Sequence, residues 1–427
     1  MKNKIAVISD HASPLATLGG VDSGGQNVYV AELAKFLALS GYDLDIYTRW
    51  EDATLPKVVN WMPGIRIIHV QAGPKEVIAK ERLLPFMDEF RENMLSFIRK
   101  GKILYGLIHA NFFFSGMVAA QLKEILGIPF VITFHALGQV RLIHQGNDDQ
   151  FPAERIQIEK DIIKKADQII AECPEDRHDL MKYYKAPSFK ITMIPCGFNT
   201  KEFYPVDKGL ARKLLKIPAD ESIILQLGRM VPRKGVDNVI RALAQVRNSN
   251  TRLLIVGGEF DEGEVLSNPE ISRLSQLAQE LGVSDSVTFI GRKNRELLKY
   301  YYSAADVFVT TPWYEPFGIT PLESMACGTP VIGANVGGIK YSVVDGQTGF
   351  LVPPNDPESL AQTVDHLLSD KELHGRMSVN SLKRVHAEFS WALIARQADQ
   401  LYQRVILSNR HTSNLFPASQ KSKIQAA

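Results

Sequence analysis

The feature that most constrains the fold is an alternation, nearly from end to end, of short apolar runs with segments of helical periodicity. The runs are rich in Ile, Val and Phe, which is typical of strands buried on both faces of a parallel sheet. They form two series, so we predict an α/β fold with two doubly wound, Rossmann-like parallel sheets. The expected strands are Ile5–Ile8, Leu44–Tyr47, Ile65–Val70, Leu107–His109, Phe130–Phe134, Ile169–Ala171 and Ile191–Ile194 in the first series, and Ile223–Leu227, Leu253–Val256, Val287–Ile290, Val307–Thr310, Val331–Ile332 and Phe350–Val352 in the second.

The two series are separated by a segment of turn-forming residues, Pro195–Pro205, which suits an interdomain linker. We expect one domain over residues 1–200 and a second over residues 206–388, since a length of 427 residues also favours two or more domains. Ligands of open parallel sheets bind beyond the carboxyl ends of the strands, so two facing sheets enclose a site between the domains. Residues 389–407 should form a last helix, and the polar residues 408–427 are expected to be a disordered tail.

Composition narrows the functional class. The chain has 49 basic and 47 acidic side chains, and this near balance argues against a general nucleic-acid or membrane-surface binder. The N-terminus starts a strand almost at once, without a signal sequence, and no apolar run approaches the roughly 18 residues that span a bilayer. Cys173, Cys196 and Cys327 are widely spaced, so we expect reduced, mostly buried thiols in a cytoplasmic protein.

The stretch Tyr314–Glu323 carries two carboxylates eight positions apart, with a predicted helix start between them. Thr320 can cap this helix, Pro321 suits its first position and Glu323 lies three residues after the cap. A helix N-terminus binds phosphate well, and carboxylates on either side could bind hydroxyls. The arrangement therefore fits a sugar nucleotide. The alternative is that Glu323 only closes a capping box.

Two loops that follow predicted first strands could contact phosphate. Gly19–Gly25 opens the first helix, and its glycines, including Gly24 and Gly25, allow close backbone approach, although their spacing is not the dinucleotide-binding Gly-x-Gly-x-x-Gly. Arg229 and Lys234 follow the first strand of the second series and could stabilise a leaving diphosphate, whereas Arg233 is expected to be exposed. The alternatives are a merely flexible loop and solvated cations.

Three further polar residues are expected near the cleft. His135 follows an apolar strand, and a structural role is its alternative. Arg141, with His144 downstream, is expected on the acceptor side, where Arg141 binds an acceptor phosphate or forms a surface salt bridge. The pair Asp43-x-Asp45 lies at a strand start, so we discount it as a metal site and expect no metal.

The run from Tyr314 to Ile332 closely resembles the Glu-x7-Glu motif of retaining glycosyltransferases of family four. Gly19–Ala34 resembles the first loop and helix of sucrose-phosphate synthases and of the inositol-phosphate glycosyltransferases of mycothiol synthesis. The resemblance implies the two-domain arrangement called GT-B, with Trp391–Leu407 crossing back to the first domain. It implies that Glu315 and His135 contact the donor sugar, that Glu323 binds the ribose and that Arg229 and Lys234 hold the diphosphate. The residues further implied in donor binding are Gly24, Gly25, Arg292, Phe317, Gly318, Ile319 and Thr320. Those implied in binding the other substrate are Asn27 and Arg141.

The expected function is transfer of a hexosyl group, with retention and without a metal or other cofactor, from a UDP-linked sugar to a small sugar, sugar-phosphate or inositol-phosphate hydroxyl. Two alternatives remain open. One is a sugar-nucleotide epimerase on the same fold, for which the glycine loop offers no acid beyond Asp22. The other is a non-catalytic binding protein with a decayed site. The acceptor, the donor sugar and the oligomeric state do not follow from the sequence.

Overall fold

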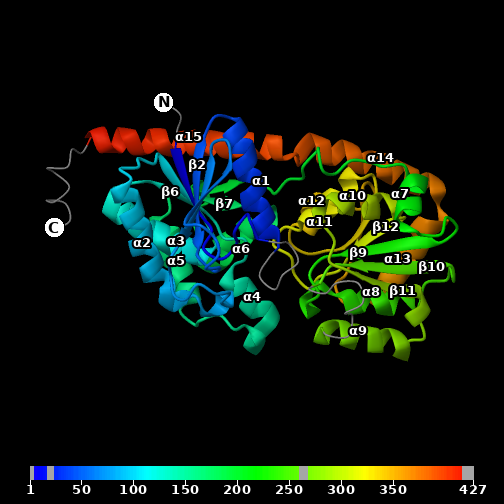
Figure 1. Ribbon diagram of the computed structural model, residues 1–427. Coiled ribbons are helices and arrows are strands. Elements are labelled where there is room, and N and C mark those ends of the chain that lie inside the picture. Colours follow the sequence, from blue (N-terminus) through cyan, green and yellow to red (C-terminus); the bar gives the residue numbers. More distant parts are fainter. Residues whose placement is uncertain (1–3, 17–23, 259–267, 416–427) are drawn as a thin grey trace.

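The computed structural model describes residues 4–16, 24–258 and 268–415, and contains two sheets placed side by side along the molecule (Figure 1). The first sheet has eight strands, in the order β3 (Val58–Met62), β4 (Ile65–Val70), β2 (Asp43–Arg49), β1 (Lys4–Ile8), β5 (Leu107–Asn111), β6 (Phe130–Thr133), β7 (Gln168–Ala171) and β8 (Ile191–Met193). The second has six, in the order β11 (Val287–Gly291), β10 (Thr251–Val256), β9 (Ser222–Leu227), β12 (Val307–Thr310), β13 (Val331–Ala334) and β14 (Gly349–Val352).

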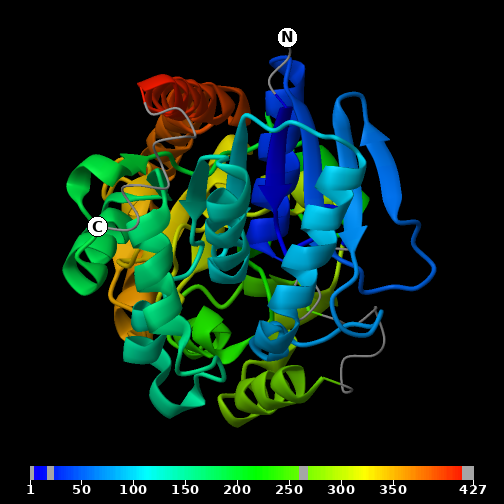
Figure 2. The same ribbon diagram turned by 90° about the vertical axis from the view of Figure 1, so that its left-hand side faces the viewer.

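Helices connect most successive strands, except β2, β3 and β4, and cover both faces of each sheet. Those of the first part of the chain are α1 (Gly25–Leu39), α2 (Met87–Lys100), α3 (Phe113–Leu126), α4 (Gly138–Gln145), α5 (Arg155–Lys165) and α6 (Pro174–Tyr184). Those of the second part are α7 (Lys208–Leu215), α8 (Val236–Leu243), α9 (Pro269–Glu280), α10 (Arg295–Ala304), α11 (Ile319–Ala326), α12 (Ile339–Ser342), α13 (Pro357–Ser369), α14 (Lys371–Glu388) and α15 (Trp391–Leu415). Figure 2 views the first half end-on, with α2 in front.

The alternation of buried strands and helices is confirmed, with two differences in the first half of the chain. β3 pairs antiparallel with β4, at the edge of an otherwise parallel sheet. Its side chains are partly buried or exposed, as expected for an edge strand with one face in solvent, and the strand therefore has no continuous apolar run that would predict it. The short helix α4, directly after His135, was also not predicted, because it has few apolar residues to bury.

The chain passes between the two halves twice, at the linker and again between α14 and α15. The crossings are hydrogen-bonded to each other: the Phe198 amide donates to the Phe389 carbonyl at 2.8 Å, and the Trp391 amide donates to the Phe198 carbonyl at 3.1 Å. A Cβ on Gly197 would lie 2.9 Å from both the Phe389 carbonyl oxygen and the Trp391 ring, so this crossing requires glycine. Trp391 itself is fully buried.

After the second crossing, α15 returns to the first sheet and packs on α1 (Figure 1). The Tyr402 hydroxyl lies 2.6 Å from Nδ1 of His109 on β5, and burial lowers the pKa of His109 to about 3.

The expected helix end at Leu407, with a disordered tail from residue 408, is wrong for residues 408–415, which continue the helix. Asn409 donates to the Gly127 carbonyl at 3.3 Å, which ties the extension to the end of α3. Residues 416–427 lie outside the described part.

Buried apolar side chains form three clusters. One includes α1, α15, Trp391 and facing strands of both sheets, and therefore joins the two halves. A second lies between the first sheet and α2, α3 and α5, and a third between the second sheet and α8, α9 and α13. No helix in the described part of the chain is both long and apolar enough to cross a membrane.

Candidate active site

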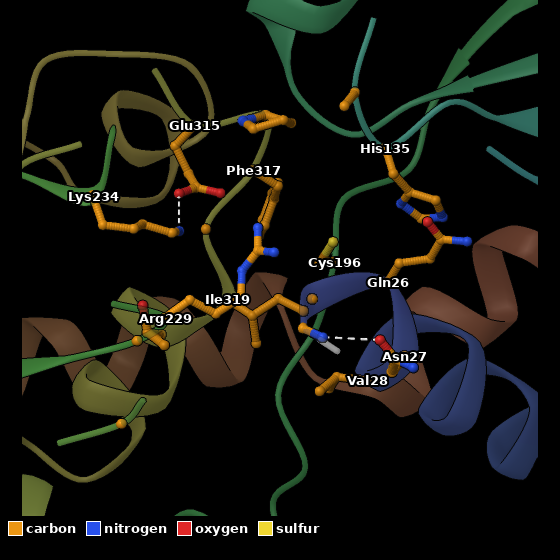
Figure 3. Close-up of a pocket in the computed structure, with 18 of the residues that line it drawn as sticks. Gln26, Asn27, Val28, His135, Cys196, Arg229, Lys234, Glu315, Phe317 and Ile319 are labelled. Carbon is orange, nitrogen blue, oxygen red and sulfur yellow. Dashed lines mark hydrogen bonds and ion pairs between the residues drawn. The ribbon is translucent and has the colours of Figure 1, made fainter. Parts of the chain in front are cut away.

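The carboxyl ends of the two sheets face each other across a cleft with a cavity volume of about 310 Å³, as expected for open parallel sheets. Its lining combines α1 and the loops after β5 and β6 with the loops after β9, β11 and β12. Figure 3 shows Glu315, Lys234 and Arg229 from the second half opposite His135, Gln26 and Asn27 from the first. The predicted site residues thus converge on one cleft.

Glu315 and Lys234 form a direct ion pair on the second-half wall (Figure 3). Arg233 Nη1 lies 3.8 Å from the same carboxylate and its guanidinium lies over the Tyr314 ring, so the expectation that Arg233 is exposed is wrong: its side chain is 16% exposed. Burial acts to raise the pKa of Glu315, but Lys234 and Arg233 outweigh it and lower that pKa. Burial, with repulsion from the two arginines, lowers the pKa of Lys234 to about 8.

The backbone of Glu315 is held from behind by the loop after β13. The Gly338 amide donates to the Glu315 carbonyl at 3.2 Å. A Cβ on Gly337, whose φ is +46°, would lie 1.8 Å from that carbonyl oxygen, and a Cβ on Gly338 would lie 2.3 Å from Phe317 backbone atoms. These two glycines therefore allow one loop to lie flat against the other, and they fix the Glu315 side chain at the cleft.

Arg229 reaches across the cleft toward the start of α1 (Figure 3). A Cβ on Gly24 would lie 3.6 Å from Nε of Arg229, and one on Gly25 would lie 3.9 Å from Ile319. The glycine backbone thus brings the first half within van der Waals distance of the predicted diphosphate residues, which is the close approach that the glycines suggested. Residues 17–23, including Gly19 and Asp22, lie outside the described part.

The helix between the two glutamates begins earlier than expected. α11 starts at Ile319, with Gly318 as its cap residue at φ +88°, so Thr320 is the second helical residue and not the cap. The Glu323 side chain does not return to the helix start. It lies 2.9 Å from Nη2 of Arg295 and accepts a 3.0 Å hydrogen bond from Tyr302. The capping box is therefore wrong, because a tertiary ion pair outcompetes the local signal. Phe317, Gly318, Ile319, Thr320 and Glu323 all line the cleft.

His135 lies on the first-half wall in a left-handed backbone conformation, φ +57°, which is unusual for a non-glycine residue. Its Nδ1 is 3.1 Å from Glu172 and its Nε2 is 3.0 Å from Oδ1 of Asn111. The Asn111 amide nitrogen donates to the Ile8 carbonyl, so Oδ1 is the acceptor toward the histidine. Both ring nitrogens thus have a polar partner, which fixes the orientation of the ring. Glu172 was not predicted.

The other predicted residues of this wall have internal partners. Asn27 accepts from the Gly24 amide at 2.9 Å and donates to the Ser13 carbonyl at 2.9 Å, which fastens the glycine loop. Arg141 contacts Asp149 at 3.1 Å and Gln145 at 3.0 Å. Both still line the cleft, as do Arg292 and the unpredicted Gln26, Lys80 and Arg295. Gln26 directly follows the glycine loop, whereas no motif marks Lys80 and Arg295, because their place depends on contacts distant in sequence.

His144 belongs to a second, smaller cavity on the other side of Glu315, where its ring stacks on Tyr314 at 4.9 Å. Asp45 lies far from the cleft chemistry: its carboxylate receives two 2.8 Å bonds from Arg66. Within residues 4–16, 24–258 and 268–415, no three His, Cys, Asp or Glu side chains group as metal ligands do. Cys173, Cys196 and Cys327 are free and buried, as predicted.

Comparison with known proteins agrees with this geometry. Residues 23–202 match the model of Glycosyltransferase Family 4, and residues 207–384 match that of Glycosyl transferases group 1. The chain is 33% identical over 416 residues to D-inositol 3-phosphate glycosyltransferase 2 of Catenulispora acidiphila, covering 95% of this chain and 96% of that one. It is 35% identical over 418 residues to a D-inositol 3-phosphate glycosyltransferase of Streptomyces bingchenggensis, covering 95% and 90%.

Among solved structures, sucrose-phosphate synthase from Thermosynechococcus elongatus is 38% identical, with a TM-score of 0.88, covering 95% of this chain and 100% of that one. Anabaena HepE in complex with UDP-glucose shares the fold at 19% identity, with a TM-score of 0.71, covering 94% and 99%. Family models, full-length relatives and the two facing sheets lead to one conclusion: this chain belongs to family four of the glycosyltransferases and has the GT-B fold.

Proposed function

We propose that this enzyme transfers a hexosyl group, with retention of configuration, from a UDP-sugar to a hydroxyl of a small sugar, sugar-phosphate or inositol phosphate. The observation that carries the proposal is the Glu315–Lys234 pair at the carboxyl edge of the second sheet, with Arg233 beside it and Arg229 on the same wall, close to Gly24 of the opposite wall. Full-length relatives named as inositol-phosphate glycosyltransferases and a sucrose-phosphate synthase structure support the acceptor class.

The donor roles follow from charge and position. Glu315 is an ionised carboxylate that can accept hydrogen bonds from sugar hydroxyls, while Lys234 and Arg229 face the position of the diphosphate. The amides at the start of α11, from Phe317 to Thr320, add donors and the positive end of a helix. Glu323 binds the ribose, and the backbone at Arg292, which also lines the cleft, reads the base.

In the reaction, the bond between the anomeric carbon and the β-phosphate oxygen breaks while the acceptor oxygen bonds to the same face of that carbon. The leaving phosphate oxygen takes the acceptor proton, so neither a separate base nor a metal ion is required. Negative charge grows on the diphosphate, and fixed cations stabilise it most in the transition state. His135, oriented by Glu172 and Asn111, contacts the donor sugar from the opposite wall.

The acceptor binds on the first-half wall, near Asn27, Arg141 and Lys80, which line that end of the cleft. The two basic side chains support an anionic acceptor. We propose a division into residues 1–200, residues 206–388 and a closing segment that begins at residue 389 and contains α15, since the linker and the second crossing separate the sheets. The three free, buried thiols support a cytoplasmic location.

The test is a panel of nucleoside diphosphate hexoses, each incubated with and without hexoses, hexose phosphates and inositol phosphates, with products followed by NMR. Transfer of sugar with the anomeric configuration of the donor supports the proposal. Conversion of the donor to another sugar nucleotide without acceptor would indicate an epimerase. Binding of UDP without turnover of any donor would indicate a non-catalytic protein.

A further inference from the structure

The buried carboxylate of Glu323 depends on two side chains of α10. Arg295, the first residue of α10, places Nη2 2.9 Å from one carboxylate oxygen, and Tyr302 donates to the other at 3.0 Å. Glu323 is 2% exposed, so water does not stabilise its charge. Arg295 is therefore the cation that opposes the effect of burial on this carboxylate and holds it in place.

Arg295 and Tyr302 both contact the interdomain linker, at the successive residues Glu202 and Phe203. Glu202 accepts from Nε of the Arg295 guanidinium at 2.5 Å, so Arg295 lies between the carboxylates of Glu202 and Glu323. The Phe203 ring lies 4.8 Å from the same guanidinium and 6.0 Å from the Tyr302 ring, edge to face. The linker thus determines the orientation of Arg295 and packs against Tyr302.

The linker is itself anchored to α1. The Asn199 side-chain amide donates to Glu32 on α1 at 2.8 Å and to Glu202 at 3.1 Å. The Asn199 carbonyl accepts from the amides of Glu202 and Phe203, which forms a tight turn. A continuous polar chain therefore runs from Glu323 through Arg295, Glu202 and Asn199 to Glu32, from one wall of the cleft to the helix that begins the other.

The charges in this chain oppose the effect of burial. Burial raises the pKa of Glu323, and Arg295 and the Tyr302 hydrogen bond act against that rise. Burial would lower the pKa of Arg295, but the carboxylates of Glu323 and Glu202 outweigh it and raise that pKa. The titratable groups that face Glu323 are Arg295 and Tyr302 on α10, Glu202 in the linker and Cys327 at the end of α11.

We propose that Arg295 is a positioning residue for the ribose site, held by Glu202 and Phe203, so that the linker between the two halves sets the affinity for the nucleotide. This inference rests on the proposed role of Glu323 as the ribose ligand. It assigns a function to linker residues that touch no substrate. A change of linker geometry then alters nucleotide binding through Arg295.

The test is calorimetric titration of Glu202→Gln, Arg295→Gln and Arg295→Lys with UDP. Glu202→Gln should weaken UDP binding about 3- to 10-fold, the range for residues coupled in one network. Arg295→Gln should weaken UDP binding more than Glu202→Gln does. The ratio of the Kd of Arg295→Gln to the wild-type Kd should decrease as pH rises from about 6 to about 8, because Glu323, once it lacks its cation, must lose its proton before it can bind the ribose. Because both Kd values are measured at the same pH, their ratio removes the effect of UDP's own titration. For Arg295→Lys, which keeps the positive charge, the ratio should not change with pH.

A matched control is the Arg252–Glu221 pair, bound at 2.7 and 2.8 Å near the amino ends of β9 and β10, away from the cleft. Glu221→Gln and Arg252→Gln should leave UDP affinity unchanged. If Glu202→Gln and Arg295→Gln bind UDP as the wild type does, or lose affinity with a ratio independent of pH, the inference is overturned while the proposed function stands. If the wild type does not bind UDP, the proposed donor site fails and the inference fails with it.

Discussion

The two walls of the cleft are built on different principles. On the second-half wall, two cations face one carboxylate, since both Lys234 and Arg233 contact Glu315. On the first-half wall, polar groups are paired within the wall: His135 with Glu172, Asn27 with Ser13 and Arg141 with Asp149. The first arrangement suits a constant, highly charged ligand such as a diphosphate, whereas the second presents a rigid, largely neutralised surface.

The comparison teaches where affinity and selectivity reside. A cation on the charged wall gains most when the diphosphate becomes more anionic, so its removal should slow chemistry. A residue on the first-half wall already has a partner, so its removal should change the fit of the acceptor and leave the donor unaffected.

The largest effect is expected for Lys234→Ala and Arg229→Ala. Each removes a fixed cation from the leaving group and should lower kcat by roughly 10²- to 10³-fold, as for other single electrostatic stabilisers. Steady-state kinetics at saturating donor measures this. A near-normal kcat with only a raised KM would show that these cations help to bind the donor but do not stabilise the transition state. That result would contradict the proposed difference between the two walls.

Glu323→Gln should weaken UDP binding by about 1.5–3 kcal/mol, the usual value of hydrogen bonds to a charged group, while Tm changes by a few degrees at most. The amide keeps the size of the side chain but not the charge that Arg295 faces. Calorimetry with UDP and thermal melts on one preparation measure both quantities. Unchanged affinity would remove Glu323 from the donor site.

The pH dependence of kcat/KM for the donor should show a fall above about pH 8. Lys234 is a cation below its lowered pKa of about 8 and loses its charge as pH rises through that value, so the clamp weakens on the alkaline side. The decline should approach about tenfold per pH unit, since one proton is involved. Lys234→Arg keeps its charge over this range, so the alkaline fall should disappear in that variant, whatever its absolute rate.

Arg141→Gln tests the first-half wall. We expect KM for the acceptor to rise about 3- to 10-fold, the effect of one already partnered cation, with Kd for UDP unchanged. Asp149→Asn is the matched control. It removes the carboxylate that contacts Arg141, so it should not weaken the binding of an anionic acceptor. A loss of UDP affinity in Arg141→Gln would show that the two walls are not separate in function.

The smallest effect is expected for metal removal. Turnover should survive EDTA nearly unchanged, because Arg229 and Lys234 supply the positive charge at the diphosphate. A collapse of activity that Mg²⁺ or Mn²⁺ restores would contradict the proposed clamp.

The sequence predicted the charged wall better than the other. Glu315, Glu323, Arg229 and Lys234 stand in short motifs directly after predicted strands, so the carboxyl edge of the sheet brings them together. The error at Thr320 arose because a capping signal is local, whereas Arg295 draws Glu323 into a contact between two helices. Glu172 directly follows the predicted strand Ile169–Ala171 and so carried the same signal, but it stands in no motif. Lys80 follows no predicted strand, and its position depends on the packing of whole segments. β3 was missed because its polar face has no continuous apolar run.

The return of α15 to the first sheet has a consequence for how the chain is made. His109 and its partner Tyr402 are separated by 293 residues, so a ribosome working at about 5–20 residues per second delivers the partner roughly 15–60 seconds later. During that interval the apolar face of α1 lacks its cover of Leu401, Tyr402 and Val405. The first half of the molecule is thus the first to be synthesised and the last to be completed. A nascent chain interrupted before residue 391 exposes the apolar face of α1, to which chaperones or other unfolded chains can bind.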